Sequence, residues 1–223
     1  MKIIFLFACC IFSLSTFSQS TKIDSTLNAL RTKHDSTLRA AIHNDSLRLE
    51  KEYAEKIREE KMSASLTYPV LNAGIMSGVV PVADIMEAPD LKKPYKLLFE
   101  LVYNNPDSAS KDINFGLSGM VRIINLHAAS GIPLKNISTV IVVHADALNA
   151  FTNNEYYKEK YKIDNPNIKL INDLQKLGCK MVACGQALAF FNIKREALLP
   201  GINVALTAQT MLSSYQMAGY VKY

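Results

Sequence analysis

The stretch formed by residues 138–144 constrains the fold more than any other part of this sequence. It reads STVIVVH, so it is rich in β-branched residues and almost continuously apolar. A strand with water on one face alternates polar and apolar residues, whereas an unbroken apolar run is typical of a central parallel strand that is buried on both faces. The fold must therefore cover both faces of a sheet, which favours the α/β class.

Strand-like and helix-like segments alternate around this run. Three further runs have the length and composition of buried strands: residues 96–103, 179–184 and 202–206. Three other segments carry apolar side chains at helical spacing: residues 113–129, 167–177 and 208–219. Such alternation is typical of right-handed βαβ crossovers. We therefore predict an α/β domain at residues 95–223, with a parallel sheet of four to five strands and helices on both faces.

The first 19 residues predict a secretory signal peptide. A lysine is followed by an apolar run at residues 3–12 and a small polar cluster at residues 13–20, as in the regions of such a peptide. The run is shorter than the roughly 20 residues that span a bilayer. We expect cleavage near Ser18 or Gln19, export to the periplasm, and no membrane attachment afterwards. A lipobox-like sequence at residues 6–9 is the alternative, but it leaves only about eight residues upstream, at the short end for this region.

Residues 20–65 predict one long charged helix that precedes the domain. They contain no Gly or Pro, and leucine recurs every eleven residues at Leu27, Leu38 and Leu49. An eleven-residue repeat suits a helix with a nearly straight stripe. Both a solvated helix and an oligomerising coiled coil fit this pattern. Residues 66–94 hold four prolines among short apolar pieces, and they predict an extended linker that wraps onto the next domain.

Charge and motif content exclude several classes of function. The net charge is +5, but acidic and basic residues alternate along most of the chain, whereas a nucleic-acid binder gathers its basic residues on one face. No G-x-G-x-x-G or G-K-[ST] follows a predicted strand, and there is no H-E-x-x-H, C-x-x-C or zinc-ligand spacing. The sequence therefore predicts no nucleic-acid partner, no cofactor and no metal.

Signal cleavage leaves two cysteines, Cys179 and Cys184. Five residues apart on one strand, their Cα atoms lie roughly 16 Å from each other, beyond the ~7 Å limit for a disulfide. Their odd offset also places them on opposite faces of the sheet. We expect two free thiols, or one that pairs with another chain.

Two residues at predicted strand ends are candidates for chemistry, because α/β sheets place their active sites beyond the carboxyl ends of the strands. Cys184 ends one strand, and Gly185 then allows a tight turn into a possible helix, whose N-terminus lowers a thiol pKa. His144 ends the neighbouring strand and could deliver a proton. The alternatives are an inert buried cysteine and a structural histidine. A Cys–His hydrolase would also need an orienting acid, for which Asp146 is the nearby candidate.

The strand–turn segments KLLFELV, STVIVVHADAL, LGCKMVACGQAL and LLPGINVALTA together resemble the DsrE/DsrF-like family, over roughly residues 90–223. The most specific parts are residues 182–188 (VACGQAL) and 142–144 (VVH). This resemblance implies a small α/β fold, assembly into trimers or hexamers, and sulfur carried as a persulfide. By the same resemblance, Cys184 would carry the sulfur, and a donor or acceptor protein would be the partner.

Two hypotheses of function follow. In the first, the chain is an exported DsrE/DsrF-like protein whose Cys184 carries sulfane sulfur, with His144 nearby. In the second, it is a non-catalytic oligomeric module of the same fold that binds a ligand or a partner, and whether the protein is an enzyme stays open. A Cys184 thiol exposed at a pocket shared with His144 favours the first hypothesis, and a thiol buried without a cleft favours the second.

Overall fold

The computed structural model describes the backbone of residues 4–223 and the side chains of residues 22–223. The chain divides into two units, Met1–Lys61 and Met62–Tyr223. The first is formed by helix α1 (Ile4–Ser65), whose last residues extend into the second unit. The predicted signal peptide, residues 1–19, lies outside the residues whose side chains are described.

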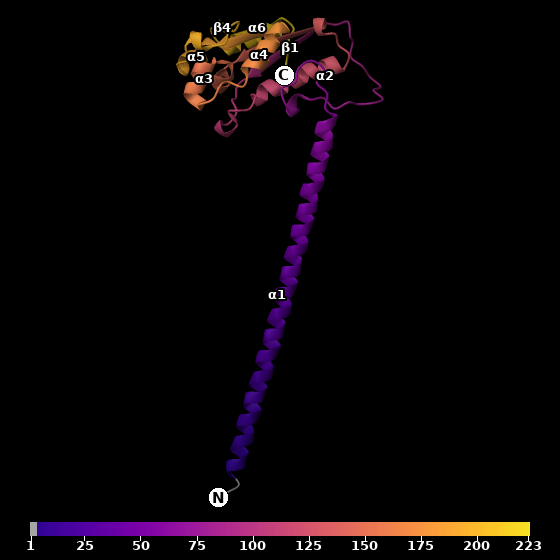
Figure 1. The fold of residues 1–223 in the computed structure, drawn as a ribbon, viewed down its shortest axis with the longest axis vertical. Helices are drawn as coiled ribbons and strands as arrows, with labels where there is room; N and C mark the ends of the chain where they lie inside the picture. Colours follow the sequence, from indigo (N-terminus) through magenta and orange to yellow (C-terminus); the bar gives the residue numbers. More distant parts are fainter. Residues whose placement is uncertain (1–3) are drawn as a thin grey trace. The chain divides into compact units, whose positions relative to one another are not determined.

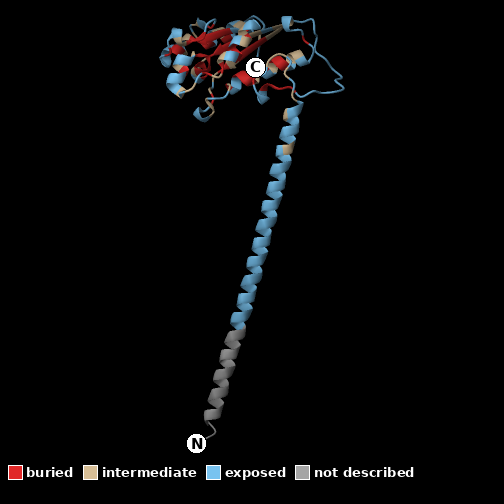
Figure 2. Cartoon of the chain, viewed as in Figure 1, coloured by how far each residue is buried: buried red, intermediate tan, exposed pale blue. Residues whose placement is uncertain are grey.

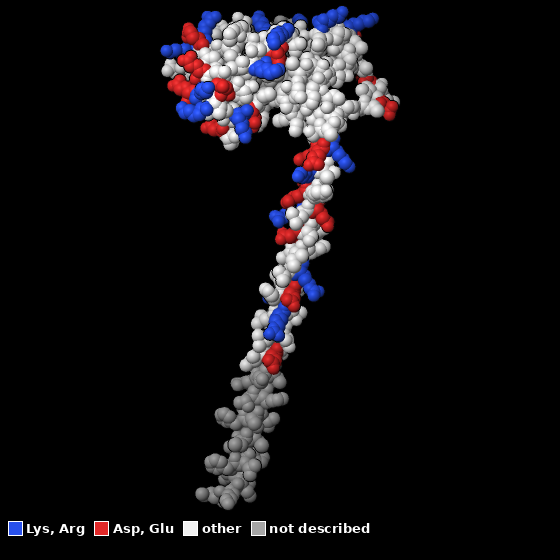
Figure 3. Space-filling model, in the orientation of Figure 1, with Lys and Arg blue, Asp and Glu red and all other residues white. Residues whose placement is uncertain are grey.

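The described part of α1 is exposed along nearly its whole length (Figure 2). Acidic and basic side chains alternate along it (Figure 3), and the repeated Leu27, Leu38 and Leu49 are all exposed. The predicted long N-terminal helix is therefore confirmed. The choice between a solvated helix and a coiled coil stays a prediction.

The second unit contains a five-stranded sheet in which all paired strands are parallel. Its strands, in chain order, are β1 (Tyr95–Leu101), β2 (Ile137–Val143), β3 (Lys180–Cys184), β4 (Asn203–Ala205) and β5 (Val221–Lys222). Their order in the sheet is β4-β3-β2-β1-β5. The predicted α/β class is confirmed, and the first four strands lie within two residues of the predicted runs. The fifth strand falls in the tail, where the sequence indicated none.

Helices cover both faces of the sheet (Figure 1). In chain order they are α2 (Phe115–Ala129), α3 (Asn154–Tyr161), α4 (Ile168–Lys176), α5 (Gly185–Phe190) and α6 (Ala208–Met217). Short 3₁₀ segments lie between them: η1 (Ile75–Ser77), η2 (Asp107–Ala109), η3 (Leu134–Asn136), η4 (Ala145–Phe151) and η5 (Arg195–Ala197). The larger core cluster packs α2 and α4 against one face, and a smaller cluster packs α6 against the other. The sequence missed η4 and α3.

Residues 66–79 pack onto α2 through a buried side chain. Asn125 of α2 donates from Nδ2 to the carbonyls of Leu71 and Ser77, at 2.8 Å each. Its Oδ1 accepts from the backbone N–H groups of Val70 and Leu71, at 3.0 and 3.2 Å. One asparagine thus satisfies four backbone groups of a segment that has no sheet partner of its own.

The connections reverse their direction of winding next to β1. The chain leaves β1 through α2 on one face, and it reaches β5, on the other side of β1, through α6 on the opposite face. In open α/β sheets, a ligand binds beyond the carboxyl ends of the strands where the direction of winding reverses. In this sheet that point lies between β1 and β5.

Candidate functional site at the carboxyl edge of the sheet

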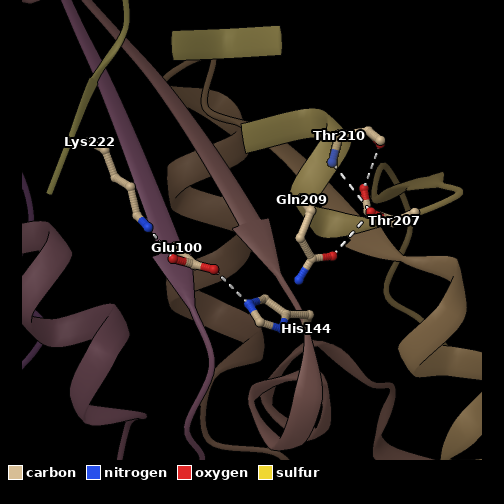
Figure 4. Close-up of polar contacts among 6 residues, drawn as sticks. All are labelled: Glu100, His144, Thr207, Gln209, Thr210 and Lys222. Carbon is tan, nitrogen blue, oxygen red and sulfur yellow. Dashed lines mark hydrogen bonds and ion pairs between the residues drawn. The ribbon is translucent and has the colours of Figure 1, made fainter. Parts of the chain in front are cut away.

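Three charged or titratable side chains meet near this point. His144, directly after β2, places Nε2 2.9 Å from Oε1 of Glu100 in β1. The other carboxylate oxygen of Glu100 forms an ion pair with Lys222 of β5. Figure 4 shows Glu100 lying between the lysine and the imidazole. The two strands that flank the winding reversal, β1 and β5, therefore contribute one group each, and the residue that follows β2 contributes the third.

Burial makes this cluster sensitive to its charge balance. The side chains of Glu100 and His144 are only 20% and 17% exposed. The hydrogen bond from Lys222 holds the pKa of Glu100 below its ordinary value; desolvation opposes this effect, and the hydrogen bond from His144 adds to it. An ionised carboxylate can only accept hydrogen bonds. The Nε2 atom of His144 therefore carries a hydrogen, and in the neutral ring Nδ1 offers a free lone pair.

The structure brings Cys184 and His144 side by side. Val143 of β2 pairs with Ala183 of β3, so the same register carried one residue further sets His144 opposite Cys184, at the strand spacing of about 4.8 Å. Cys184 shares an apolar cluster with Val142, and His144 follows Val142 by two residues, which places both candidates on the face covered by α6. In Figure 4, the Nδ1 atom of His144 lies on the side of the ring away from Glu100.

Cys184 itself is buried. The residue is 5% exposed and packs among apolar side chains that include Leu98 of β1 and Ala208 and Leu212 of α6. Within the described part of the chain, its thiol makes no hydrogen bond, and the residue does not line the groove of α3 that is described below. The thiol therefore lies beneath α6 and does not open into a cleft.

The helix indicated after Cys184 is present as α5, but it is a short one. Cys184 is its N-cap residue, and the side chain makes no capping hydrogen bond. The backbone N–H of Gln186, which would face a capping group, donates instead to the carbonyl of Leu206 at 3.1 Å. Gly185 is required here because an added Cβ would lie 2.8 Å from the Ala205 carbonyl oxygen. The carbonyl of Leu206, directly after β4, therefore occupies an amide at the start of α5 that could otherwise have faced the thiol.

The second cysteine is a core residue. Cys179 lies in the cluster on the opposite face, among residues of α2 and α4, and burial raises its pKa to about 12. Both Cys179 and Cys184 are free. The prediction of two unlinked thiols on opposite faces is confirmed.

The acid beside His144 was not the one that the sequence analysis considered. Ala145 has a positive φ of 50° and turns the chain into η4, so Asp146 is exposed and makes no contact with the imidazole that we describe. Glu100 takes that place from another strand. The sequence feature that could have identified Glu100 is that it is the single carboxylate within the mostly apolar run of residues 96–103.

The N-terminus of α6 adds uncharged polar groups to the site. The Oγ1 atom of Thr207 accepts from the backbone N–H of Thr210 at 3.3 Å and donates to the side chain of Gln209 at 3.1 Å. Figure 4 shows the Gln209 amide extending from α6 in the direction of His144. The start of α6 thus places an amide and a hydroxyl group on the side of the sheet where the imidazole lies.

A separate open groove of about 750 Å³ lies between α3 and the loop after α5. Aromatic and charged side chains line it together, among them Tyr156, Lys160, Phe191, Lys194 and Glu196.

Among the described side chains, no three His, Cys, Asp or Glu residues gather as a metal site would require. In that same part of the chain, no helix is both long and apolar enough to span a membrane.

The fold and the site define a small α/β protein with a parallel sheet, in which His144 and Cys184 lie at the carboxyl ends of neighbouring strands. The model of the DsrE/DsrF-like family matches residues 96–221, and the chain belongs to this family. Its domain therefore has the general fold of sulfur-relay proteins, as the sequence resemblance implied.

One similar solved structure is titled "Structure of Protein of Unknown Function MTH1491 from Methanobacterium thermoautotrophicum". The two chains are 17% identical with a TM-score of 0.42, and the match covers 58% of this chain and 97% of the other. A search of the curated proteins gives no match.

Proposed function

We propose that this chain is an exported sulfane-sulfur carrier in which Cys184 holds the sulfur and His144 handles the proton. The observation that carries the proposal is that the strand register continued past Val143 and Ala183 sets Cys184 opposite a histidine whose Nε2 atom is held by Glu100. A nucleophile beside a base that is itself oriented by a third group is the general arrangement for an activated thiol. Export rests on the signal-like sequence of residues 1–19.

The transfer step balances without an external oxidant. The Cys184 thiol gives its proton to Nδ1 of His144, and the thiolate attacks the terminal sulfur of a donor persulfide, R–S–SH. The S–S bond of the donor breaks as a new S–S bond forms on Cys184. The donor leaves as a thiolate and takes the proton from the imidazolium, so that Cys184 becomes a persulfide and the donor a thiol.

Lys222 suits this role because it neutralises Glu100. A carboxylate alone would stabilise the protonated imidazolium, which cannot accept a proton. A carboxylate already paired with an ammonium group still orients the ring but attracts the extra proton less strongly. Access is the remaining requirement, because Ala208 and Leu212 pack over the thiol. The proposal therefore includes a displacement of α6 when the donor arrives.

The test is sulfur loading followed by peptide mass spectrometry. We expect incubation of the native chain with polysulfide to add the mass of one sulfur atom to the peptide that contains Cys184. Cys179→Ser is the matched control, because it removes a thiol from the same segment but the opposite face, and it should load as wild type does. Cys184→Ser should not load, and His144→Gln should load more slowly at neutral pH.

A second candidate, a non-catalytic binding module of the same fold, is favoured by the burial of Cys184 beneath α6. The groove beside α3 would then be the ligand site. The loading experiment separates the two candidates. If Cys184 gains sulfur only after the chain is unfolded, the carrier proposal fails and the binding module stands.

A further inference from the structure

Residues 80–91, which we call the arm, form an exposed extended segment between η1 and β1. Met86 is 100% exposed, and Val82 and Ile85 are also exposed. None of residues 80–89 makes a hydrogen bond with the described part of the chain. Figure 2 shows this loop in the colour of exposed residues throughout. An apolar segment with neither packing nor hydrogen bonds of its own does not recover the entropy lost in ordering it.

The arm is also acidic. It carries Asp84, Glu87 and Asp90 and no basic residue, and acidic atoms are visible on this loop in Figure 3. Both of its ends are held on the α2 side of the sheet. Val79 pairs with Thr67 in the segment that Asn125 binds, and the carbonyl of Leu91 accepts a hydrogen bond from Asn136 at 2.8 Å.

A second surface without a partner lies on the other side of the sheet. Residues 197–221 contain no charged residue, the longest such stretch in a chain that is 20% charged. They include the outer side of α6 and the edge strand β4. Leu206 and Met217 within them are 72% and 83% exposed. Depletion of charge together with exposed large apolar side chains is the compositional mark of a protein interface.

Lysines border this uncharged surface near the C-terminus of α6. Lys96 donates to the carbonyl of Ala218 at 2.9 Å, and its ammonium group lies 5.6 Å from the centre of the Tyr220 ring. Lys180 is placed in the same way over Tyr215, also at 5.6 Å. The surface is therefore uncharged at its centre and positive at its border.

We propose that the arm of one chain docks on the α6 surface of a second copy of this chain. The arm carries exposed apolar side chains and a negative charge. The α6 surface has an uncharged centre with exposed apolar side chains and lysines at its border, so the two surfaces are complementary in both hydrophobicity and charge. The arm is anchored on the α2 side of the sheet and α6 covers the opposite face, so the contact is made between two chains and not within one.

Such a contact joins two different surfaces, and it therefore builds a ring if the rotation between copies closes. The proposal goes beyond the sulfur chemistry and does not depend on it. A chain that assembles in this way but leaves Cys184 unloaded would support the docking and contradict the carrier role. A chain that loads Cys184 with sulfur but does not assemble through this contact would support the carrier role and contradict the docking.

Cross-linking of mixed chains tests the contact directly. One chain carries Met86→Cys and the other Met217→Cys, with every other cysteine replaced by serine, and a short bismaleimide is added to the mixture. We expect a product of twice the chain mass. Leu134→Cys, which is exposed on η3, is the matched control and should give no product with Met86→Cys.

Charge reversal supplies an independent readout. Sedimentation equilibrium should show Glu87→Lys and Lys180→Glu each weakening assembly by about two- to fivefold, the range of an exposed ion pair, while a mixture of the two variants assembles as wild type does. A wild type that stays monomeric overturns the proposal. So does a cross-link that forms between two Met86→Cys chains and not with Met217→Cys, or assembly that persists through α1 with no cross-link.

Discussion

Asn125→Ala should release the segment of residues 66–79 from α2. Asn125 is completely buried, and its amide makes four hydrogen bonds to the backbone of this segment at 2.8 to 3.2 Å. Alanine removes all four and leaves a cavity of about the size of the amide. The buried backbone groups that lose their partner then have either no hydrogen bond or water.

The magnitude follows from the count of hydrogen bonds. A hydrogen bond contributes about 1 kcal/mol net, so four together are worth about 4 kcal/mol. The loss is smaller where water enters the space left by the amide and satisfies part of the segment's backbone. We therefore expect the free energy of unfolding to fall by about 2 to 4 kcal/mol.

Urea unfolding measures this free energy, and hydrogen exchange locates the change. The amides of Val70 and Leu71 should exchange faster in Asn125→Ala, while those of β2 change only with global stability. Asn136→Ala is the control, because that asparagine makes a single exposed hydrogen bond, to the Leu91 carbonyl outside this segment, and its loss should cost less than 1 kcal/mol. A loss below about 1 kcal/mol in Asn125→Ala, with Val70 and Leu71 still protected, would refute this reasoning.

Two further predictions concern the carboxyl edge. Gly185→Ala should lower the free energy of unfolding by about 1 to 3 kcal/mol, because the added Cβ would lie 2.8 Å from the Ala205 carbonyl oxygen. The control is Gly119→Ala, which has open space for a Cβ and should raise the free energy of unfolding by up to about 1 kcal/mol. Lys222→Met removes the main cause of the lowered pKa of Glu100. The ionised carboxylate stabilises the fold above its ordinary pKa of 4.5, and this contribution is lost as the pH falls through the lower folded pKa. The free energy of unfolding should therefore decrease less between pH 6 and pH 3 in the variant than in wild type, and equal slopes would contradict the assignment.

The sheet could be predicted because a strand that is buried on both faces has a continuous apolar sequence, which is a local feature of the chain. Residues 138–144 lack alternation, and β2 occupies 137–143 of the chain, one residue away. The short strands were harder to predict. β5 has two residues, and it is a strand because Tyr223 donates its backbone N–H to the Leu98 carbonyl and stacks its ring on Phe99. Neither contact can be inferred from the order of apolar and polar residues in this short segment.

The candidate site was predictable only in part, for the same reason. His144 and Cys184 follow apolar runs, so the rule for strand ends finds them without knowledge of the tertiary structure. Their environment depends on pairing across the sheet. The burial of Cys184 comes from α6, which crosses the sheet after β4, and the acid beside His144 comes from β1. A rule based on proximity in sequence selects Asp146 instead of Glu100.

Glu100 connects the site to the stability of the last strand. A carboxylate that is largely removed from water costs several kcal/mol unless charged partners compensate, and an apolar residue at this position would serve the core better. The cost is offset by Lys222 and His144, but Lys222 is within reach only when β5 is paired with β1. The ion pair in turn holds a strand that is too short to be stable alone. An Ile in place of Glu100 would therefore be tolerated by the packing of the core but would free both β5 and the imidazole, which indicates that the charge serves the last strand and the site and not the packing of the core.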